Sequence, residues 1–441
     1  MKDSGVEWIG KIPEDWKLRK IKYILSERKE KNNPVVTENI LSLSIERGVF
    51  PYSEKTGGGN KAKDDLTAYK VARPNDIVIN SMNILAGAVG ISKYTGAVSP
   101  VYYTLYSSSD FVNVKYYYYL FMTETFQKSL LGLGNGIMMK ESANGKLNTI
   151  RMRISMDKLS SLYLPFPSKD TQNRIVKKIE GFIELIDSII SETQQSIDEL
   201  KKYKQALITE TVTKGLDKNA EMKDSGIDIL PLINDGWKVE RVKNLFSMTK
   251  GLSITKENLE DEGIPVISYG EIHSKYGFNF NPEIDYVKNV NTSYLENSKS
   301  ALLEKGDFIF ADTSEDINGS GNFTCFTGSI KTFAGYHTII LKAKVKFNYQ
   351  YLAYLFDSSI FRSQIQKSVQ GIKVFSITQR ILKNQWVWLP PIEIQDEIVK
   401  YLDGKRIVIV KLISEKLTEL NELDTYKKSL IFEYVTGKKE A

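Results

Sequence analysis

The sequence predicts a mixed α/β (α+β) protein built as a pseudo-two-fold tandem repeat, with two similar domains separated by an antiparallel two-helix coiled coil. Three observations lead to this prediction. Blocks of the first half recur in the same order in the second half, and the last block of each half has the apolar spacing of a coiled coil. Between the blocks, short apolar strands alternate with helical patterns.

The first repeated block lies at the start of each half. Residues 2–22 align without gaps on 223–243, and eight of the 21 positions are identical, Trp16 and Trp237 among them. We interpret the two tryptophans as packing anchors. A second block, 112–137, aligns on 347–372. The shared framework and its order predict two copies of one unit.

The segments between the blocks are predicted to be α/β. Strands are expected at 76–79, 98–105, 307–310 and 336–341, and helices at 115–131 and 350–366. Residues 23–111 and 244–346 share little with each other, so each copy carries a divergent insert. Tyr116 and Tyr119 are interpreted as core residues, and so is His337, because it falls in an expected apolar strand.

The third block, 172–213 on 395–436, predicts one long helix in each half. Apolar residues recur at steps of four and three, and Thr193, Lys204, Lys416 and Lys427 interrupt them as polar seam residues. The expected helix–helix spacer residues are Ile186, Ile190, Ile197, Leu200, Leu207, Ile409, Ile413, Leu420, Leu423 and Leu430. A helix with such a stripe needs a partner, and we expect the repeat to supply it in antiparallel orientation.

Prolines before each long helix, at 165–167 and 390–391, set the expected boundaries. We predict a first α/β domain at 1–165, a first helical region at 166–213 and a linker at 214–222. A second α/β domain follows at 223–389, and a second helical region at 390–441.

Composition excludes several classes of function. The 441 residues carry a net charge of +6, one cysteine (Cys325) and two histidines, so neither a disulfide framework nor a metal site is expected. No apolar run approaches about 18 residues, and the first ten residues lack the pattern of a signal peptide. We expect a protein of the reducing cytoplasm without a membrane segment.

Catalytic motifs are not found. Gly145-Lys146 and Gly437-Lys438 are not followed by Ser or Thr, so the phosphate-binding loop of nucleotide hydrolases is missing. Pro390-Pro391 lacks the flanking residues of an adenine methyltransferase loop. We therefore predict no catalytic residue in this chain.

At this point the chain resembles the specificity subunit of type I restriction–modification systems. The resemblance is carried by 2–10 with Ile12-Pro13-x-x-Trp16, by Leu164-Pro165-x-Pro167 with Gln172, and by the echo of Leu389-Pro390-Pro391 with Gln395. It implies a non-catalytic subunit with two target recognition domains, each reading one half of a bipartite target in double-stranded DNA. The helical spacer would set the half-site separation and help to dock two modification subunits.

The resemblance also implies the rest of the complex. The modification subunits are adenine methyltransferases that bind S-adenosylmethionine, so no cofactor is expected on this chain, and motor-nuclease restriction subunits complete the assembly. The family gives no signature for DNA contacts. Basic and amide side chains in expected loops are the candidates: Asn60, Lys61, Lys63, Asn135, Lys140, Arg151, Arg153, Lys331, Gln370, Lys373 and Arg380.

Two other interpretations stay open at the level of sequence. One is a single-chain modification enzyme with a degenerate catalytic motif. The other is a phage-derived coiled-coil scaffold without DNA specificity.

Overall fold

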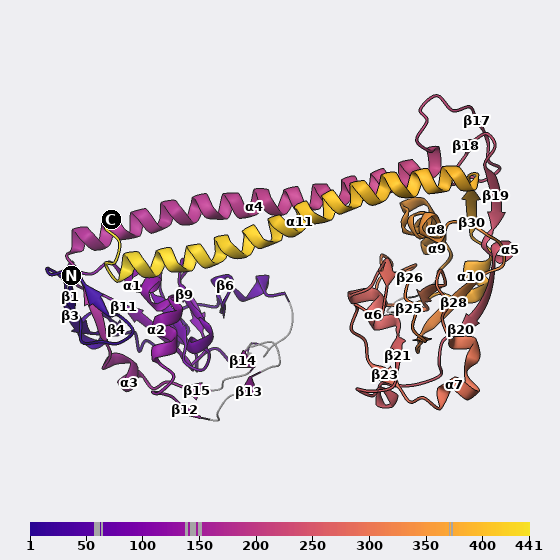
Figure 1. Ribbon diagram of the computed structural model, residues 1–441. Helices are drawn as coiled ribbons and strands as arrows, with labels where there is room; N and C mark the ends of the chain where they lie inside the picture. Colours follow the sequence, from indigo (N-terminus) through magenta and orange to yellow (C-terminus); the bar gives the residue numbers. More distant parts are fainter. Residues whose placement is uncertain are drawn as a thin grey trace. The chain divides into compact units, whose positions relative to one another are not determined.

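The structure is a computed structural model, which describes residues 1–56, 62, 65–136, 140–141, 147–148, 152–369, 371 and 374–441. The chain divides into two compact units (Figure 1). The first unit combines Met1–Thr193 with Leu417–Ala441, and the second is Gln194–Lys416. Each unit therefore holds one α/β part and one half of each long helix.

The first unit is built around a four-stranded antiparallel sheet in the order β4-β11-β8-β9. Its core joins the inner face of this sheet to helix α1 and to the ends of the long helices. The elements in chain order are β1 (Lys2–Asp3), β2 (Lys11–Ile12), β3 (Lys17–Lys20), β4 (Ser26–Glu27), β5 (Leu41–Ser44), β6 (Gly48–Pro51), β7 (Lys70–Ala72), β8 (Ile77–Asn80), β9 (Val89–Ile91), β10 (Gly96–Val98), β11 (Tyr102–Tyr106), α1 (Val114–Phe121), α2 (Glu124–Ser129), β12 (Asn135–Gly136), β13 (Lys140–Glu141), β14 (Leu147–Asn148), β15 (Met152–Arg153), α3 (Met156–Ser160), β16 (Tyr163–Phe166) and α4 (Lys169–Lys214).

The second unit has a five-stranded sheet in the order β20-β28-β24-β26-β22, in which β22 runs parallel to β26 and the other neighbours are antiparallel. Its elements are β17 (Met222–Asp224), β18 (Leu232–Asn234), β19 (Lys238–Arg241), α5 (Val242–Leu245), β20 (Phe246–Lys250), β21 (Ile264–Ile267), α6 (Tyr269–Ser274), β22 (Asn279–Phe280), β23 (Asn289–Val290), α7 (Tyr294–Asn297), β24 (Phe308–Ala311), β25 (Thr313–Ser314), β26 (Phe323–Phe326), β27 (Phe333–Ala334), β28 (Thr338–Ala343), α8 (Tyr349–Asp357), α9 (Ser359–Ser368), β29 (Phe375–Ser376), α10 (Gln379–Lys383), β30 (Trp386–Leu389) and α11 (Ile392–Val435).

Both units contain the same framework elements in the same order. The two-stranded ribbon β3–β16 of the first unit corresponds to β19–β30 of the second, and the helix pair α1–α2 corresponds to α8–α9. Trp16 and Trp237 are buried beside these ribbons, at 4% and 5% exposure, as expected of packing anchors. The predicted tandem repeat of mixed α/β domains is confirmed.

The single helices expected at 115–131 and 350–366 are each two helices instead. Thr123 and Ser358 stop the first helix and cap the second, because each hydroxyl accepts a hydrogen bond from a backbone N–H three residues later. A hydroxyl that satisfies an N-terminal amide favours a new helix start. The strand expected at 98–105 is also divided, by a turn between β10 and β11.

The interpretation of His337 as a buried core residue is wrong. The strand begins one residue later, at Thr338, and the His337 side chain is 55% exposed. Its backbone has a φ of 55°, outside the range of a strand.

The long helices pack antiparallel. In the first unit, Ile179 and Ile186 near the start of α4 meet Leu430 and Ile431 near the end of α11. Figure 1 shows the start of α4 running beside the end of α11. In the second unit, the end of α4 shares a core with Ile398 at the start of α11. The antiparallel two-helix coiled coil is thus confirmed. Across the described residues, no helix has the length and apolar character to cross a membrane.

The predicted seam positions are all buried or half-buried along both helices. Ile186, Ile197, Ile409 and Leu430 are buried, at 4%, 0%, 4% and 2% exposure. The remaining seam positions, apolar and polar, are half-buried except for Thr193, which is buried: Ile190, Leu200, Lys204, Leu207, Ile413, Lys416, Leu420, Leu423 and Lys427. In the first unit, the polar seam residue Lys427 forms an ion pair with Asp187 at 2.6 Å.

Candidate functional site

A buried glutamine fixes the start of each long helix to its α/β domain. Gln172 is fully buried, and its Oε1 accepts a hydrogen bond from the Asn113 backbone N–H at 2.7 Å while its Nε2 donates to the Pro167 carbonyl at 2.9 Å. Gln395 makes the same two bonds in the second unit, to the Asn348 N–H and the Pro390 carbonyl. Because an unpaired buried amide is costly, this repeated contact determines how the helix leaves the domain.

A tyrosine in each α/β domain contacts the last turns of one of the two long helices through its hydroxyl group. The Tyr116 hydroxyl donates to the Val435 carbonyl at 2.7 Å, and the Tyr351 hydroxyl lies 3.4 Å from the Val212 carbonyl and 3.1 Å from that of Trp388. Burial raises the pKa of both phenols well above the usual value. The first α/β domain thus contacts the end of α11, and the second α/β domain contacts the end of α4. Each domain is therefore attached to the long helix that follows the other domain in the sequence.

Each framework ribbon carries a basic edge, which was not among the predicted DNA-binding residues. Lys20 lies 5.2 Å from the ring of Tyr163 on β3–β16, and Arg241 lies 3.4 Å from the ring of Trp386 at the equivalent place on β19–β30. Such stacking holds a cation in place over an aromatic face. Further basic residues continue these edges, namely Lys17, Arg19 and Lys22 in the first unit and Lys238 and Lys243 in the second.

This basic edge can bind phosphate. In the described part of the chain no carboxylate forms an ion pair with any of these ribbon cations. Phosphate groups of a nucleic-acid backbone are bound by lysine and arginine side chains of this kind. A sequence signal for the ribbon existed, since 17–22 and 238–243 belong to the repeated first block.

The structure brings together some of the candidate DNA-binding residues and not others. Arg153 on β15 is exposed, and its backbone pairs with that of Asn135 on β12. Lys140 lies on β13, Lys331 is exposed between β26 and β27, and Arg380 is exposed on α10. The remaining candidates lie outside the described residues: Asn60, Lys61, Lys63, Arg151, Gln370 and Lys373.

Two adjoining cavities lie in the second unit, lined by residues of the divergent insert 244–346 and of the segment 374–380. The larger, of about 720 Å³, is lined by aromatic and polar side chains that include Tyr269, His273 and Tyr336. The second, of about 500 Å³, contains the predicted residue Arg380 together with Lys250. Asp312 lines the second cavity, and His337 lines both.

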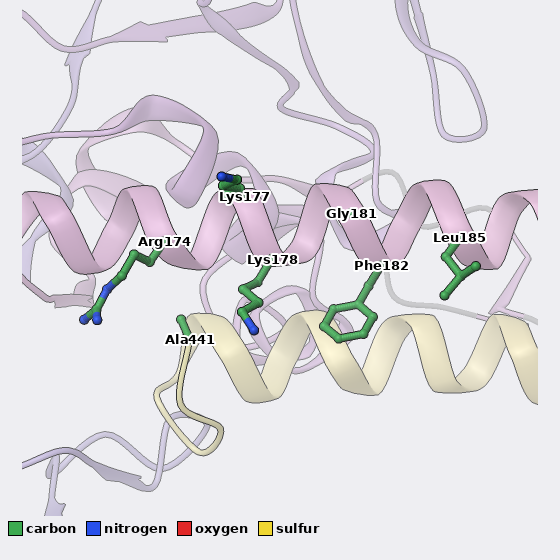
Figure 2. Close-up of a pocket in the computed structure, with 7 residues that line it drawn as sticks. All are labelled: Arg174, Lys177, Lys178, Gly181, Phe182, Leu185 and Ala441. Carbon is green, nitrogen blue, oxygen red and sulfur yellow. The ribbon is translucent and has the colours of Figure 1, made fainter.

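A groove lies on the helix pair of the first unit. Arg174, Lys177 and Lys178 line it together with Gly181, Phe182, Leu185 and Ala441. Figure 2 shows Lys178 and Phe182 pointing from α4 toward α11, and the Phe182 ring stacks on Tyr434 with centroids 6.0 Å apart. Leu185 at the end of the groove is 57% exposed. The groove thus combines an apolar floor with a basic rim.

Neither a metal-binding cluster nor an activated thiol is found among the described residues. The part of the chain that the structure describes holds no cluster of three His, Cys, Asp or Glu side chains able to bind a metal. Cys325 is fully buried, and burial raises the pKa of its thiol, which disfavours the reactive thiolate.

Comparisons with known proteins agree with this architecture. The family model described as "Type I restriction modification DNA specificity domain" matches twice, at residues 13–201 and 234–422. The MjaVIII specificity subunit of Methanocaldococcus jannaschii is 22% identical, over 97% of this chain and 94% of that protein. The EcoKI specificity subunit of Escherichia coli is 24% identical, over 64% of this chain and 58% of that protein.

Solved structures show the same fold. A chain from a structure on the assembly and conformational transition of a type I restriction–modification system superposes with a TM-score of 0.70, at 13% identity, over 97% of this chain and all of that one. The HsdS subunit of Thermoanaerobacter tengcongensis gives a TM-score of 0.52, at 14% identity, over 97% of this chain and 98% of that one. Since the family model covers both halves, this chain belongs to the type I restriction–modification specificity subunits and carries two specificity domains in tandem.

Proposed function

We propose that this chain is the non-catalytic subunit that gives a type I restriction–modification complex its DNA sequence specificity. Each recognition domain reads one half of a bipartite target in double-stranded DNA. The observation that carries the proposal is a repeated framework that bears two unlike inserts. A shared framework suits a common task, whereas unlike inserts suit two different half-sites.

The domain boundaries follow from the same proposal. The recognition domains are residues 1–165 and 223–389, the helical regions are 166–213 and 390–441, and 214–222 links the two copies. The basic ribbons β3–β16 and β19–β30 bind DNA phosphates in the same way in both domains. Bases are read by the divergent segments 23–111 and 244–346, where Lys331 is an exposed candidate. Arg153 and Arg380 are exposed candidates for DNA contacts outside these two segments.

The helix pair acts as a molecular ruler, which means that it sets the distance between the two half-sites. Its seam residues are buried or half-buried along both helices, so the pair has a defined register rather than the freedom of a linker. A rigid pair of helices between two reading domains would hold the half-sites at a fixed distance.

The outer faces of the helices dock two modification subunits, which are adenine methyltransferases that use S-adenosylmethionine. The support is a set of exposed positions that recur in both copies. Leu185 and Val408 are equivalent and are 57% and 56% exposed, and Tyr203 and Tyr426 are equivalent and are 54% and 52% exposed. Exposed apolar side chains that serve no core and recur at equivalent positions in both copies support an interaction surface.

Small residues accompany these apolar ones. Gly181 and Gly404 are also equivalent, and a Cβ at either position would meet nothing within 4 Å, so the backbone is open to a close partner. A surface present twice suits two copies of one partner. Motor-nuclease restriction subunits would join this assembly in the cytoplasm, where cellular DNA lies.

The proposal is tested by methylation-sensitive sequencing of DNA from cells that express the chain with its modification subunits. We expect methylated adenines in one motif of two defined half-sites separated by a fixed, unread spacer. The purified chain alone should transfer no methyl group from S-adenosylmethionine to DNA. Methyl transfer by the chain alone would support a single-chain enzyme instead, and methylation without sequence preference would support a scaffold.

A further inference from the structure

His337 is a non-glycine residue held in the left-handed region of backbone conformation, with a φ of 55°. Among the described residues only Asn75 shares this property, with a φ of 68°. A side chain at such a φ is sterically disfavoured, and strain of this kind gathers at functional sites. Because a glycine at this position would relieve the backbone strain, we expect the imidazole side chain itself to have a function.

The imidazole is held in one orientation at the rim of the two cavities in the second unit. Its Nδ1 lies 3.1 Å from Asp312 Oδ1, and the rings of Tyr269 and Tyr336 meet it edge-on, with centroids 5.3 and 6.0 Å away. In the neutral imidazole, a carboxylate partner favours the proton on Nδ1, which leaves the lone pair on Nε2. No described residue hydrogen-bonds to Nε2, and the side chain is 55% exposed.

The Asp312 carboxylate that contacts this ring is itself held in place by hydrogen bonds. The Asp312 backbone N–H donates to the His337 carbonyl at 3.0 Å, and the Thr313 hydroxyl donates to Asp312 Oδ1 at 2.8 Å. The Thr313 carbonyl in turn accepts from His273 Nε2 at 2.8 Å. Asn322 Nδ2 then donates to His273 Nδ1, also at 2.8 Å. A polar chain thus holds the carboxylate that orients His337.

Two cations share the rim with His337. Lys250 and Arg380 line the same cavity, both are exposed, and neither forms an ion pair with any residue that the structure describes. The lining of one cavity therefore offers an oriented hydrogen-bonding group together with two positive charges that form no ion pair among the described residues. That combination suits a duplex, in which base edges lie between two phosphate backbones.

The position of these residues in the sequence agrees with a role in selecting a sequence. His337, Asp312 and Lys250 all fall in 244–346, the insert that has little in common with the first copy. Residues that distinguish one half-site from the other must lie in such divergent segments, because the framework is common to both domains.

We propose that His337 reads a base of the second half-site, with Nε2 accepting a hydrogen bond from the exocyclic amino group of an adenine or cytosine in the major groove. Lys250 and Arg380 bind the flanking phosphates. Only these two bases present an amino donor in that groove. The inference rests on the proposed function, and it names the residue that selects one position of the target.

The test is His337→Gly in the complete complex, with adenine methylation mapped by sequencing. Glycine accepts this backbone, so the variant should unfold at the wild-type temperature or above it. We expect about a tenfold loss of preference at one position of the second half-site, and an unchanged first half-site and spacing. Arg380→Ala should weaken binding to all sequences alike and lower the salt dependence of binding by about one charge.

Two variants serve as matched controls. Asn75→Gly makes the same backbone change in the first unit, where the repeat already has Gly306 at the equivalent position, and should leave both half-sites unchanged. Lys305→Ala removes an exposed cation of the second unit that lines neither cavity and should also change nothing.

The outcomes separate the two proposals. A folded His337→Gly complex that methylates the wild-type motif with the wild-type preference overturns the role of His337, and so does relaxation within the first half-site. A wild-type complex without a bipartite target would overturn the proposed function itself.

Discussion

Lengthening the helix pair by one heptad should lengthen the spacer between the half-sites. The change duplicates Asp187–Thr193 in α4 and the equivalent Val410–Lys416 in α11, so that each helix gains seven residues. Both insertions fall at the boundary of a compact unit, after Thr193 and after Lys416. Seven residues preserve the four-and-three spacing of the seam, so the buried positions stay in register.

The expected size of the effect follows from helix geometry. At about 1.5 Å per residue, seven residues add about 10 Å to the helix pair. With about 3.4 Å between base pairs along one strand, this corresponds to a spacer longer by about three base pairs. Both half-sites should keep their bases, because neither recognition domain is altered.

The assay is methylation-sensitive sequencing of DNA from cells that express the variant with its partner subunits. Gln195→Ala, an exposed change at constant helix length, is the control and should leave the spacer as it is. If the lengthened variant folds, methylates DNA and keeps the wild-type spacing, the helix pair is not the ruler.

Three further predictions concern stability and reactivity. Gln395→Leu should lower the free energy of unfolding by about 2–4 kcal/mol, because the Asn348 N–H and the buried Pro390 carbonyl lose their partner. The control Glu397→Leu, at an exposed position, should change the free energy of unfolding by less than about 0.5 kcal/mol in the same denaturant titration. Tyr116→Phe should cost about 1–3 kcal/mol through the loss of its bond to a buried carbonyl, and Tyr203→Phe, at an exposed site, should cost little. Burial raises the pKa of the Cys325 thiol, so the folded chain should resist a thiol reagent at pH 8 and react at one thiol when unfolded; rapid labelling of the native protein would contradict the buried position.

The repeat and the coiled coil could be predicted because their signals are long and redundant. The seam from Ile186 to Leu207 recurs from Ile409 to Leu430, and the structure buries or half-buries each of these positions. Gln172 and Gln395 could be recognised as repeated residues, but the sequence does not show that they hydrogen-bond the start of each long helix to its domain. Their partners, at Asn113 and Asn348, lie 59 and 47 residues away in the sequence, and only the fold brings them together.

Local features were harder to predict. The break of each expected helix at Thr123 and Ser358 depends on one capping hydroxyl inside an otherwise continuous helical pattern. His337 was misassigned because its neighbours are apolar, and a positive φ leaves no trace in hydrophobic periodicity. Contacts to DNA depend on which side chains the fold exposes together. Arg380 illustrates this, since its neighbour Lys250 is 130 positions away.

Exchange of one recognition domain tests most directly whether the two copies read DNA independently. Residues 23–163 would be replaced by the corresponding segment of another family member, and the methylated motif of the chimeric complex would be sequenced. Independent domains predict a new first half-site beside an unchanged second half-site and an unchanged spacer. A chimera that folds and methylates DNA but alters both half-sites, or neither, would contradict the account.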